Sequence, residues 1–267
     1  RVEDPRFLRG RGQYVADVNR KGQLHAVILR SSVAHGRIRR IHGTGALNLP
    51  GVRAVITARD LGPDVPRIPL RLQSLPELEP FRQPMLADGK VRFVGEPMAV
   101  IVAESAAIAE DALELIEVDI ESLPAVTGRV DAEAAKAIVF EAHGSNVSIG
   151  WTAVRGDVEA AFRSADYVRR ETFRVQRHAP LFMEPRGFVA EWDAVTEKLT
   201  VWGAAKVAFA NRKILAEAMG LSERQIEMIE LDVGGGFGSR GEFYPEDFLI
   251  PFASRELNRP VKWIEDR

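Results

Sequence analysis

Residues 226–240 have the sequence IEMIELDVGGGFGSR, in which a predicted strand over 226–233 runs directly into four glycines in five residues. Glycine loses more conformational freedom on folding than any other residue, so this density disfavours both a strand and a helix. It suits a backbone that turns sharply or lies against a ligand, with its N–H groups left for the ligand's oxygens. The stretch therefore predicts either a ligand-facing loop or a strained strand-to-helix turn that binds nothing.

The spacing of these glycines excludes two common nucleotide-binding motifs. A dinucleotide-binding loop would need its third glycine at the position of Ser239. A phosphate-binding loop spanning Gly236 and Gly241 would need Lys and then Ser or Thr, but Glu242 and Phe243 follow. Nucleotide binding by this loop is therefore not expected.

The sequence around the loop predicts further helices and strands. Pro245 suits the first turn of a helix that continues to Leu257, because proline has no N–H to leave unpaired there. A second helix is expected over 209–219, with Gly220 as its C-cap. The other predicted elements are a helix over 157–164, a strand over 167–177, a hairpin of strands 188–192 and 198–202, and a strand over 259–264.

The first half of the chain predicts a smaller α/β unit. The second half of 91–103 is continuously apolar, as in a strand covered on both faces. Residues 62–90 hold six prolines and no hydrophobic period, so we expect an extended loop outside the core. The remaining predicted elements are strands over 23–31, 51–57 and 117–121, and a helix from the N-cap Ser105 to Ile116.

These elements predict a mixed α/β (α+β) fold in two domains. The first domain is expected over 1–125 and the second over 151–267. The intervening residues 126–150 are rich in Ala, Gly and Asp and weakly patterned, which indicates a linker. The chain has no initiator Met and stops just after a strand-like run, so we expect that both ends are cut.

The composition narrows the classes of function. The 36 basic and 38 acidic side chains leave a net charge of -2, without the basic excess typical of nucleic-acid binding. With no cysteine, the chain carries no disulfide, thiolate zinc site or cysteine-ligated iron–sulfur cluster, so any such cluster must belong to a partner. No run of about 18 apolar residues predicts a membrane span. The five histidines show neither ligand spacing nor a Ser–His–Asp arrangement, so the sequence indicates no metal ligands and no catalytic residues.

Several separated motifs resemble the molybdopterin-binding large subunit of the xanthine dehydrogenase and aerobic carbon monoxide dehydrogenase family. The matching stretches, in order, are 1–12, 94–97 with 102–104, 183–187, 233–240 and 259–267. Independent matches in register are far more specific than one glycine loop. The resemblance implies the family's hammerhead domain followed by the first part of its molybdenum-cofactor domain.

The resemblance implies a molybdenum-dependent oxidoreductase that hydroxylates an aldehyde or a heterocycle, or oxidises carbon monoxide, with water as the oxygen source. The implied cofactor is a molybdenum–pterin, molybdopterin itself or its cytosine dinucleotide form. The implied partners are the remaining C-terminal half of the large subunit, an iron–sulfur small subunit and an FAD-binding medium subunit. The resemblance further implies a dimer of heterotrimers in the cytoplasm, with no nucleic-acid or membrane partner.

By resemblance, Gly235, Gly236, Phe237 and Gly238 lie beside the cofactor. The glycines let the backbone approach the cofactor, and the Phe237 ring would cover the outer face of the cofactor. No catalytic residue is implied within the chain, because the family's catalytic glutamate comes from sequence beyond Arg267. We therefore expect this segment alone to be inactive and not to retain the cofactor tightly.

Two positions depart from the family pattern. Lys206 stands where relatives place a glutamine near the metal; it is either a charged point donor or an exposed loop lysine. Gly241 stands where xanthine-type enzymes carry a substrate-facing glutamate, which argues against xanthine as the substrate. The alternative function is a non-catalytic scaffold or assembly unit that keeps the fold without the cofactor.

Three further residues near the matched motifs are candidates for a structural or functional role. His178 is expected to be structural or to support the site indirectly, since a lone histidine without a spaced partner is no metal site. Glu184 and Arg186 are expected to pair with each other or to shape the pocket.

Overall fold

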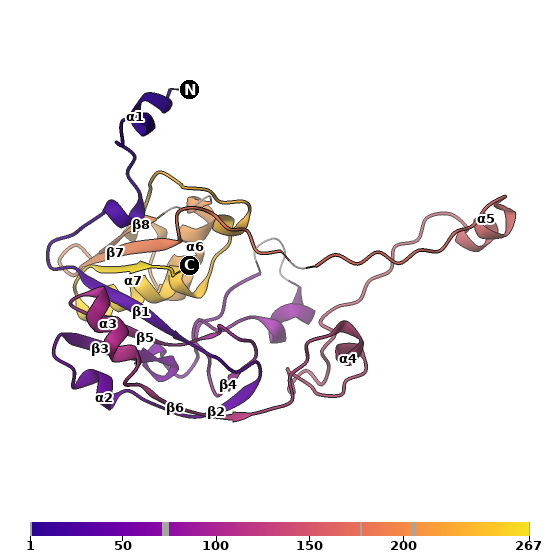
Figure 1. The fold of residues 1–267 in the computed structure, drawn as a ribbon, viewed down its shortest axis with the longest axis horizontal. Coiled ribbons are helices and arrows are strands. Elements are labelled where there is room, and N and C mark those ends of the chain that lie inside the picture. Colours follow the sequence, from indigo (N-terminus) through magenta and orange to yellow (C-terminus); the bar gives the residue numbers. More distant parts are fainter. Residues whose placement is uncertain (1, 71–74, 177, 204–206, 267) are drawn as a thin grey trace.

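The computed structural model describes residues 2–70, 75–176, 178–203 and 207–266. Its described strands form a seven-stranded sheet of order β3-β5-β1-β10-β7-β8-β9 and a three-stranded sheet of order β4-β2-β6 (Figure 1). The strands are β1 Leu24–Arg30, β2 Gly36–His42, β3 Val52–Thr57, β4 Lys90–Val91, β5 Pro97–Ala103, β6 Glu117–Ser122, β7 Gly187–Asp193, β8 Lys198–Gly203, β9 Ile226–Glu230 and β10 Val261–Ile264. The α-helices are α1 Asp4–Leu8, α2 Thr44–Leu47, α3 Ala106–Leu113, α4 Arg129–Glu133, α5 Val158–Ser164, α6 Ala208–Met219 and α7 Pro245–Leu257. Short 3-10 helices are η1 Val15–Asp17, η2 Ala58–Leu61, η3 Pro76–Phe81, η4 Glu223–Gln225 and η5 Ser239–Gly241.

Strand β5 lies between β3 and β1, and all seven of its residues are buried. Successive side chains of a strand point to opposite faces, so a strand covered on both faces is apolar throughout. Val100 and Val102 join one hydrophobic core, while Ala99 and Ile101 join another. The predicted strand with two covered faces is confirmed.

The two cores are closed by different elements. The first packs α6 and α7 against the sheet, and Leu215 and Phe248 are among its fully buried side chains. The second packs α3 and residues of the three-stranded sheet against the opposite face. Helix α3 begins as predicted, because the Ser105 side chain accepts a hydrogen bond from the Ile108 N–H. Helix α6 also ends as predicted, at Gly220 in the left-handed conformation.

The seven-stranded sheet contains strands from both predicted domains. β10 pairs in parallel with β1, with Leu24 opposite Val261 and His25 opposite Lys262, and antiparallel with β7. The α6–α7 core therefore includes side chains from both halves of the chain. The boundaries 1–125, 126–150 and 151–267 remain a prediction about domain organisation.

Two predictions about particular segments are wrong. The proline-rich stretch 62–90 was expected outside the core, but Met85 and Leu86 are fully buried, because its end turns back over the α6–α7 core. Residues 167–176 form no strand, although their alternation predicted one. A strand needs a neighbour for its N–H and C=O groups, and these residues pair with no strand of the described sheets.

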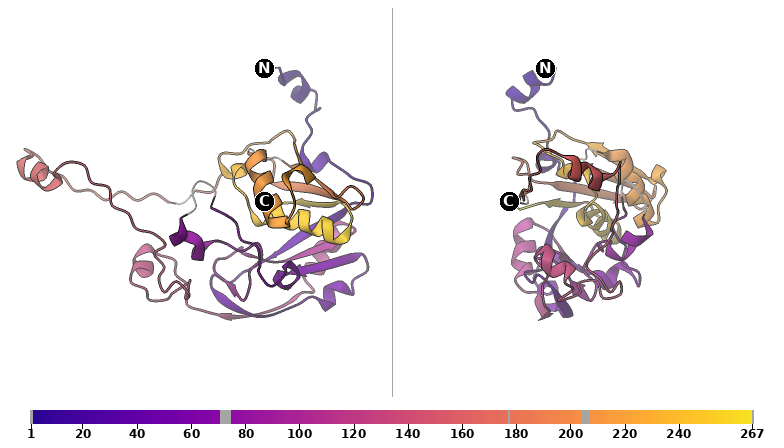
Figure 2. Two further views of the ribbon diagram at one scale, coloured as in Figure 1. Left: turned by 180° about the vertical axis from the view of Figure 1, so that it is seen from behind. Right: turned by 90° about the vertical axis from the view of Figure 1, so that its right-hand side faces the viewer.

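Residues 149–176, here called the arm, extend away from both sheets (Figures 1 and 2). All of them are exposed except the half-exposed Ala160. The arm carries α5, the helix predicted over 157–164. Its N-cap Asp157 accepts a hydrogen bond from the Ala160 N–H, and its apolar Phe162 is 58% exposed. Within the described residues, no helix is both long and apolar enough to cross a membrane.

Candidate functional site

The glycine loop, residues 234–238, follows β9 and leads into α7 through η5. Gly235 and Gly238 have φ values of 110° and 98°, which side chains with a Cβ rarely adopt. Phe237 also has a positive φ, of 42°, and its side chain is 76% exposed. A bulky residue held in this region costs about 1 kcal/mol or more, and such strain is concentrated at functional sites.

The loop presents backbone donors to its surroundings. Among the residues that the structure describes, the N–H groups of Gly235, Gly236, Phe237 and Gly238 have no hydrogen-bond partner. Gly235 and Gly236 are half-exposed, and the next two residues are exposed. Neighbouring free N–H groups of this kind form a concave surface that attracts the oxygens of a ligand.

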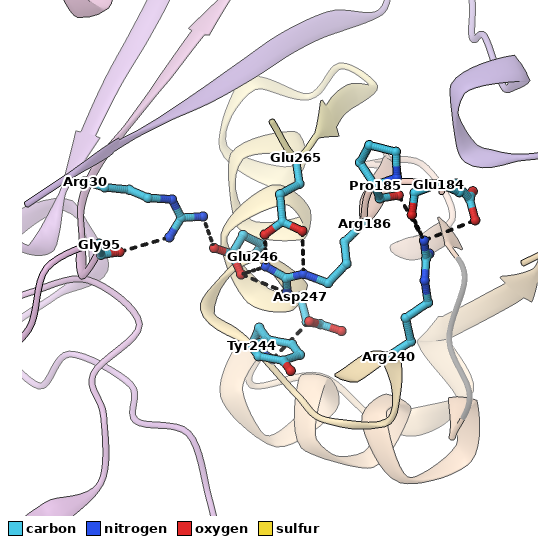
Figure 3. Close-up of polar contacts among 10 residues, drawn as sticks. All are labelled: Arg30, Gly95, Glu184, Pro185, Arg186, Arg240, Tyr244, Glu246, Asp247 and Glu265. Atoms are coloured by element: carbon cyan, nitrogen blue, oxygen red, sulfur yellow. Dashed lines mark hydrogen bonds and ion pairs between the residues drawn. The ribbon is translucent and has the colours of Figure 1, made fainter. Parts of the chain in front are cut away.

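Glu184 and Arg240 contact each other (Figure 3), and Glu184 also binds the first residue of the loop. The Glu184 carboxylate accepts a hydrogen bond of 2.8 Å from the Gly234 N–H and lies 3.2 Å from the Arg240 guanidinium. Arg240 Nη2 also donates to the backbone carbonyls of Glu184 and Pro185. A Cβ on Gly234 would lie 2.4 Å from the Glu184 Cβ, so only glycine fits at this crossing.

A second ionic cluster joins this site to β1. Arg186 makes two hydrogen bonds to the Glu265 carboxylate, of 3.0 and 2.6 Å, and lies 3.4 Å from Glu246 (Figure 3). Glu246 is 1% exposed and also accepts from Arg30 at 2.5 Å. Burial lowers the pKa of Arg186, but its hydrogen bond to Glu265 and the charge of Glu246 outweigh this and raise it.

Arg30 and Tyr244 extend this cluster on its two sides. Arg30 donates to the Gly95 carbonyl at 3.2 Å, so the cluster reaches the loop that precedes β5. The Arg186 guanidinium stacks 4.1 Å from the Tyr244 ring centroid. Arg186 is thereby fixed between a carboxylate pair and an aromatic face.

Asp247 lies beside the cluster in the first turn of α7 and is 3% exposed. Burial raises its pKa to about 7, although its carboxylate accepts a hydrogen bond from the Tyr244 N–H. Burial also raises the pKa of the Tyr244 phenol. The site therefore holds a carboxyl group that changes its charge near neutral pH.

The structure brings together only some of the residues that the sequence singled out. Of the two alternatives for Glu184 and Arg186, a mutual pair is not formed: Glu184 pairs with Arg240, and Arg186 pairs with Glu246 and Glu265. The other alternative, that they shape the pocket, stays a prediction. His178 is exposed. Lys206 lies outside the described residues.

Sequence reasoning missed the buried cluster on α7. By their positions after Pro245, Glu246 and Asp247 suit a helix first turn, because acids are favourable at the positive end of the helix dipole, but this pattern does not indicate that they are buried. A usable signal was present, because the two acids precede the apolar run of Phe248 to Ile250, which marks a buried helix start. Among the described residues, no group of three or more His, Cys, Asp or Glu side chains is placed to hold a metal ion.

Comparisons with known proteins identify the domains of this chain. Residues 9–124 match the family model for the aldehyde oxidase and xanthine dehydrogenase a/b hammerhead domain, and residues 139–267 match the molybdopterin cofactor-binding domain. The nicotine 6-hydroxylase large subunit of Paenarthrobacter nicotinovorans is 37% identical over 267 residues, which cover 100% of this chain and 33% of that relative. The carbon monoxide dehydrogenase large chain of Hydrogenophaga pseudoflava is 36% identical, over 99% of this chain and 34% of its own length.

Comparison with solved structures finds related oxidoreductases as well. Quinoline 2-oxidoreductase from Pseudomonas putida 86 superposes with a TM-score of 0.92 at 39% identity, covering 100% of this chain and 34% of that one. The Cu,Mo-CO dehydrogenase superposes with a TM-score of 0.89 at 36% identity, covering 100% and 35%. The chain therefore belongs to the family of molybdopterin-binding large subunits of the xanthine dehydrogenase and carbon monoxide dehydrogenase type. It spans about a third of the length of the relatives that it matches.

Proposed function

We propose that this chain forms one wall of the cofactor site of a molybdenum hydroxylase-type oxidoreductase, with residues 235–238 lying against a molybdenum–pterin cofactor. The run of four backbone N–H groups without a described partner, in a loop whose outer side is exposed, carries this proposal. The loop fits such a group, because a metal held by the sulfur atoms of its pterin needs no cluster of protein ligands. The cofactor would supply the redox chemistry, and the protein its orientation and hydrogen bonds.

The residues of this chain would position that cofactor. The free N–H groups donate to its oxygens, and the exposed Phe237 ring covers it from one side. Glu184 and Arg240 keep the loop in place while it does so. Lys206 remains part of the proposed site by its position in the sequence alone.

We propose an N-heterocycle as the substrate of the whole protein, hydroxylated with oxygen from water, ahead of an aldehyde or carbon monoxide. The names of the nicotine 6-hydroxylase and quinoline 2-oxidoreductase relatives support this choice. Gly241 in place of a substrate-facing glutamate argues against xanthine. The proposed partners are the rest of the large subunit, an iron–sulfur small subunit and an FAD-binding medium subunit, in a cytoplasmic dimer of heterotrimers. The proposed cofactor is molybdopterin or its cytosine dinucleotide form.

The substitution Gly236→Ala tests the cofactor contact in the full-length protein. A Cβ at this position meets only the Arg240 side chain, at 3.9 Å, so the fold tolerates it. If the backbone lies against the cofactor, the added methyl group lowers the molybdenum and pterin content per protein several-fold, without changing the free energy of unfolding. Gly150→Ala is the matched control, because a Cβ there meets open space in the arm. Unchanged molybdenum content in Gly236→Ala would contradict the proposal.

The 267-residue chain alone provides a second test. Elemental analysis of the purified chain is expected to find little molybdenum, because this chain supplies one wall of the site. Near-stoichiometric metal would contradict that expectation. A full-length protein that folds but contains neither molybdenum nor pterin would instead favour the scaffold function.

A further inference from the structure

A small chamber lies beside Arg240, two residues after the glycine loop. It lies between the start of β7, helix α6, η5 and helix α7, and its volume available to water centres is ≈ 10 Å³. A cavity of roughly 10–15 Å³ on this measure holds about one water molecule. The polar side chains that line it are those of Arg186, Asn211, Arg240, Glu242, Tyr244 and Asp247.

Two polar atoms of this chamber lack a partner among the described residues. They are Asn211 Oδ1, on a residue that is 1% exposed, and Arg240 Nε, on a residue that is 5% exposed. A buried polar group left without a hydrogen bond costs about 1–3 kcal/mol, and few are left so in folded proteins. One of these atoms is an acceptor and the other carries a hydrogen, so a molecule that both donates and accepts satisfies the two at once.

The charges around the chamber argue against a bound anion. Both guanidiniums that line it already have carboxylate partners: Arg186 pairs with Glu246 and Glu265, and Arg240 with Glu184. Among the described residues that line the chamber, neither guanidinium is therefore left as an uncompensated cation that would attract an anion. Asp247, whose pKa is raised to about 7 by burial, adds a third polar group that can donate or accept.

We propose that this chamber is a binding site for one structural water, which accepts a hydrogen bond from Arg240 Nε–H and donates one to Asn211 Oδ1. Asn211 is thereby a positioning residue for Arg240. Arg240 in turn holds the Glu184 and Pro185 carbonyls, and the Glu184 carboxylate holds the Gly234 N–H. Through Arg240 and Glu184, the water and Asn211 thus stabilise the position of the glycine loop, whether or not a cofactor is bound.

A crystal structure of the full-length protein at a resolution that shows ordered water tests the site directly. One density peak within hydrogen-bond distance of both Arg240 Nε and Asn211 Oδ1 is expected. An empty chamber, a peak bonded to only one of these atoms, or a chamber filled by another side chain overturns the proposal.

Substitution of Asn211 tests the positioning role. Asn211→Leu keeps the side-chain size but removes the acceptor, so the hydrogen-bonded backbone amides of Gly234 and Ser239 are expected to exchange hydrogen about tenfold faster, the ratio that corresponds to roughly 1.4 kcal/mol. Asn211→Asp keeps an acceptor oxygen and is expected to keep the slow exchange. Lys213→Leu, at an exposed position of the same helix, is the matched control.

Hydrogen exchange by mass spectrometry distinguishes a local effect from a general loss of stability. Faster exchange confined to 234–240 in Asn211→Leu supports the proposal. Equal exchange in Asn211→Leu and the wild-type protein, or an equal acceleration in β5 and α7, contradicts it. These readouts do not depend on bound molybdenum, so they stand apart from the test of the cofactor contact.

Discussion

The buried strand β5 and the exposed arm show what apolar residues do with and without a covering surface. All seven residues of β5 are buried, because α3 and the α6–α7 pair cover its two faces. The arm is also rich in large apolar side chains, yet Trp151 is 82% exposed and Phe173 is 83% exposed. Apolar surface stabilises a fold only where it is removed from water, so the same kind of residue contributes greatly in one region and little in the other.

The largest expected difference between the regions is in their susceptibility to protease. Exposed backbone that does not belong to a cooperatively folded unit opens locally with almost no increase in free energy. The sheet, in contrast, opens only when the whole fold unfolds. Limited trypsin digestion of the 267-residue chain is expected to cut first within the arm, at Arg155, Arg163 and Arg169. Mass spectrometry of the early fragments checks this. Early cuts after Arg53 or Arg259 would show that the two regions do not differ as proposed.

Two phenylalanine substitutions compare the regions in terms of stability. Phe248 is 2% exposed in the α6–α7 core, so Phe248→Ala is expected to lower the free energy of unfolding by about 3–5 kcal/mol. Phe173→Ala, in the arm, removes the same kind of side chain from an exposed position. It is expected to change the free energy of unfolding by less than about 0.5 kcal/mol. Urea unfolding followed by circular dichroism measures both. Similar losses of unfolding free energy in the two variants would mean that the arm packs against the rest of the chain.

Two glutamates compare a buried ion pair with an exposed one. Glu246→Gln leaves Arg30 and Arg186 with less compensating charge, and is expected to cost about 2–3 kcal/mol, because Arg186 keeps Glu265. Glu171→Gln in the arm breaks only an exposed pair with Arg169, and is expected to cost less than about 0.5 kcal/mol. Unfolding at low and high salt distinguishes them further, since screening weakens only the exposed pair. A loss in Glu246→Gln no larger than that in Glu171→Gln would contradict the role given to the cluster.

The smallest expected effect is a pH dependence of the free energy of unfolding that arises in the packed sheets and helices and not in the arm. The pKa of Asp247 is raised by burial from 3.8 to about 7, so the folded state binds its proton more tightly than the unfolded state. Its contribution to stability is fully present below pH 4 and is lost as the pH rises through 7. Asp247→Asn removes this loss, and its neutral amide can still accept from the Tyr244 N–H.

Thermal unfolding at pH 5 and pH 8 measures this effect. The Asp247→Asn variant is expected to be more stable than the wild-type chain at pH 8 by about 1–2 kcal/mol, with a smaller difference at pH 5. Asp166→Asn in the arm is the control and is expected to change neither value. A variant that is less stable than the wild-type chain at pH 8 would show that the charged carboxylate is favoured in the fold.

Much of the local structure was predictable because its signals lie within a few residues of each other. The Ser105 cap, the Gly220 terminus and the hairpin of β7 and β8 follow from capping, turn and alternation patterns, and the structure confirms them. The family was equally readable, since its motifs recur in order along the chain. The proposed contacts of Gly235 to Gly238 with a cofactor remain a prediction.

The failures have a common physical reason. Alternation over 167–176 satisfied the pattern of a strand, but a strand also needs a partner that no local pattern can supply. The proline-rich loop was judged by its irregular spacing, whereas the burial of Met85 depends on which surface the loop meets. The pair of Glu184 with Arg240 was not foreseen, because Arg240 comes within reach only after the glycine loop folds back.

The sequence by itself determined several helix and strand termini, such as the Ser105 cap and the Gly220 terminus, the glycine-rich loop, and the family that the chain resembles. These properties depend on the chemistry of neighbouring residues. Only the tertiary structure decided that β10 joins β1, that Glu246 and Asp247 are buried, and that Asn211 and Arg240 line one chamber with a polar atom each that has no partner among the described residues. Those features join residues far apart in the chain, and their burial and pairing exist only once the elements have packed together.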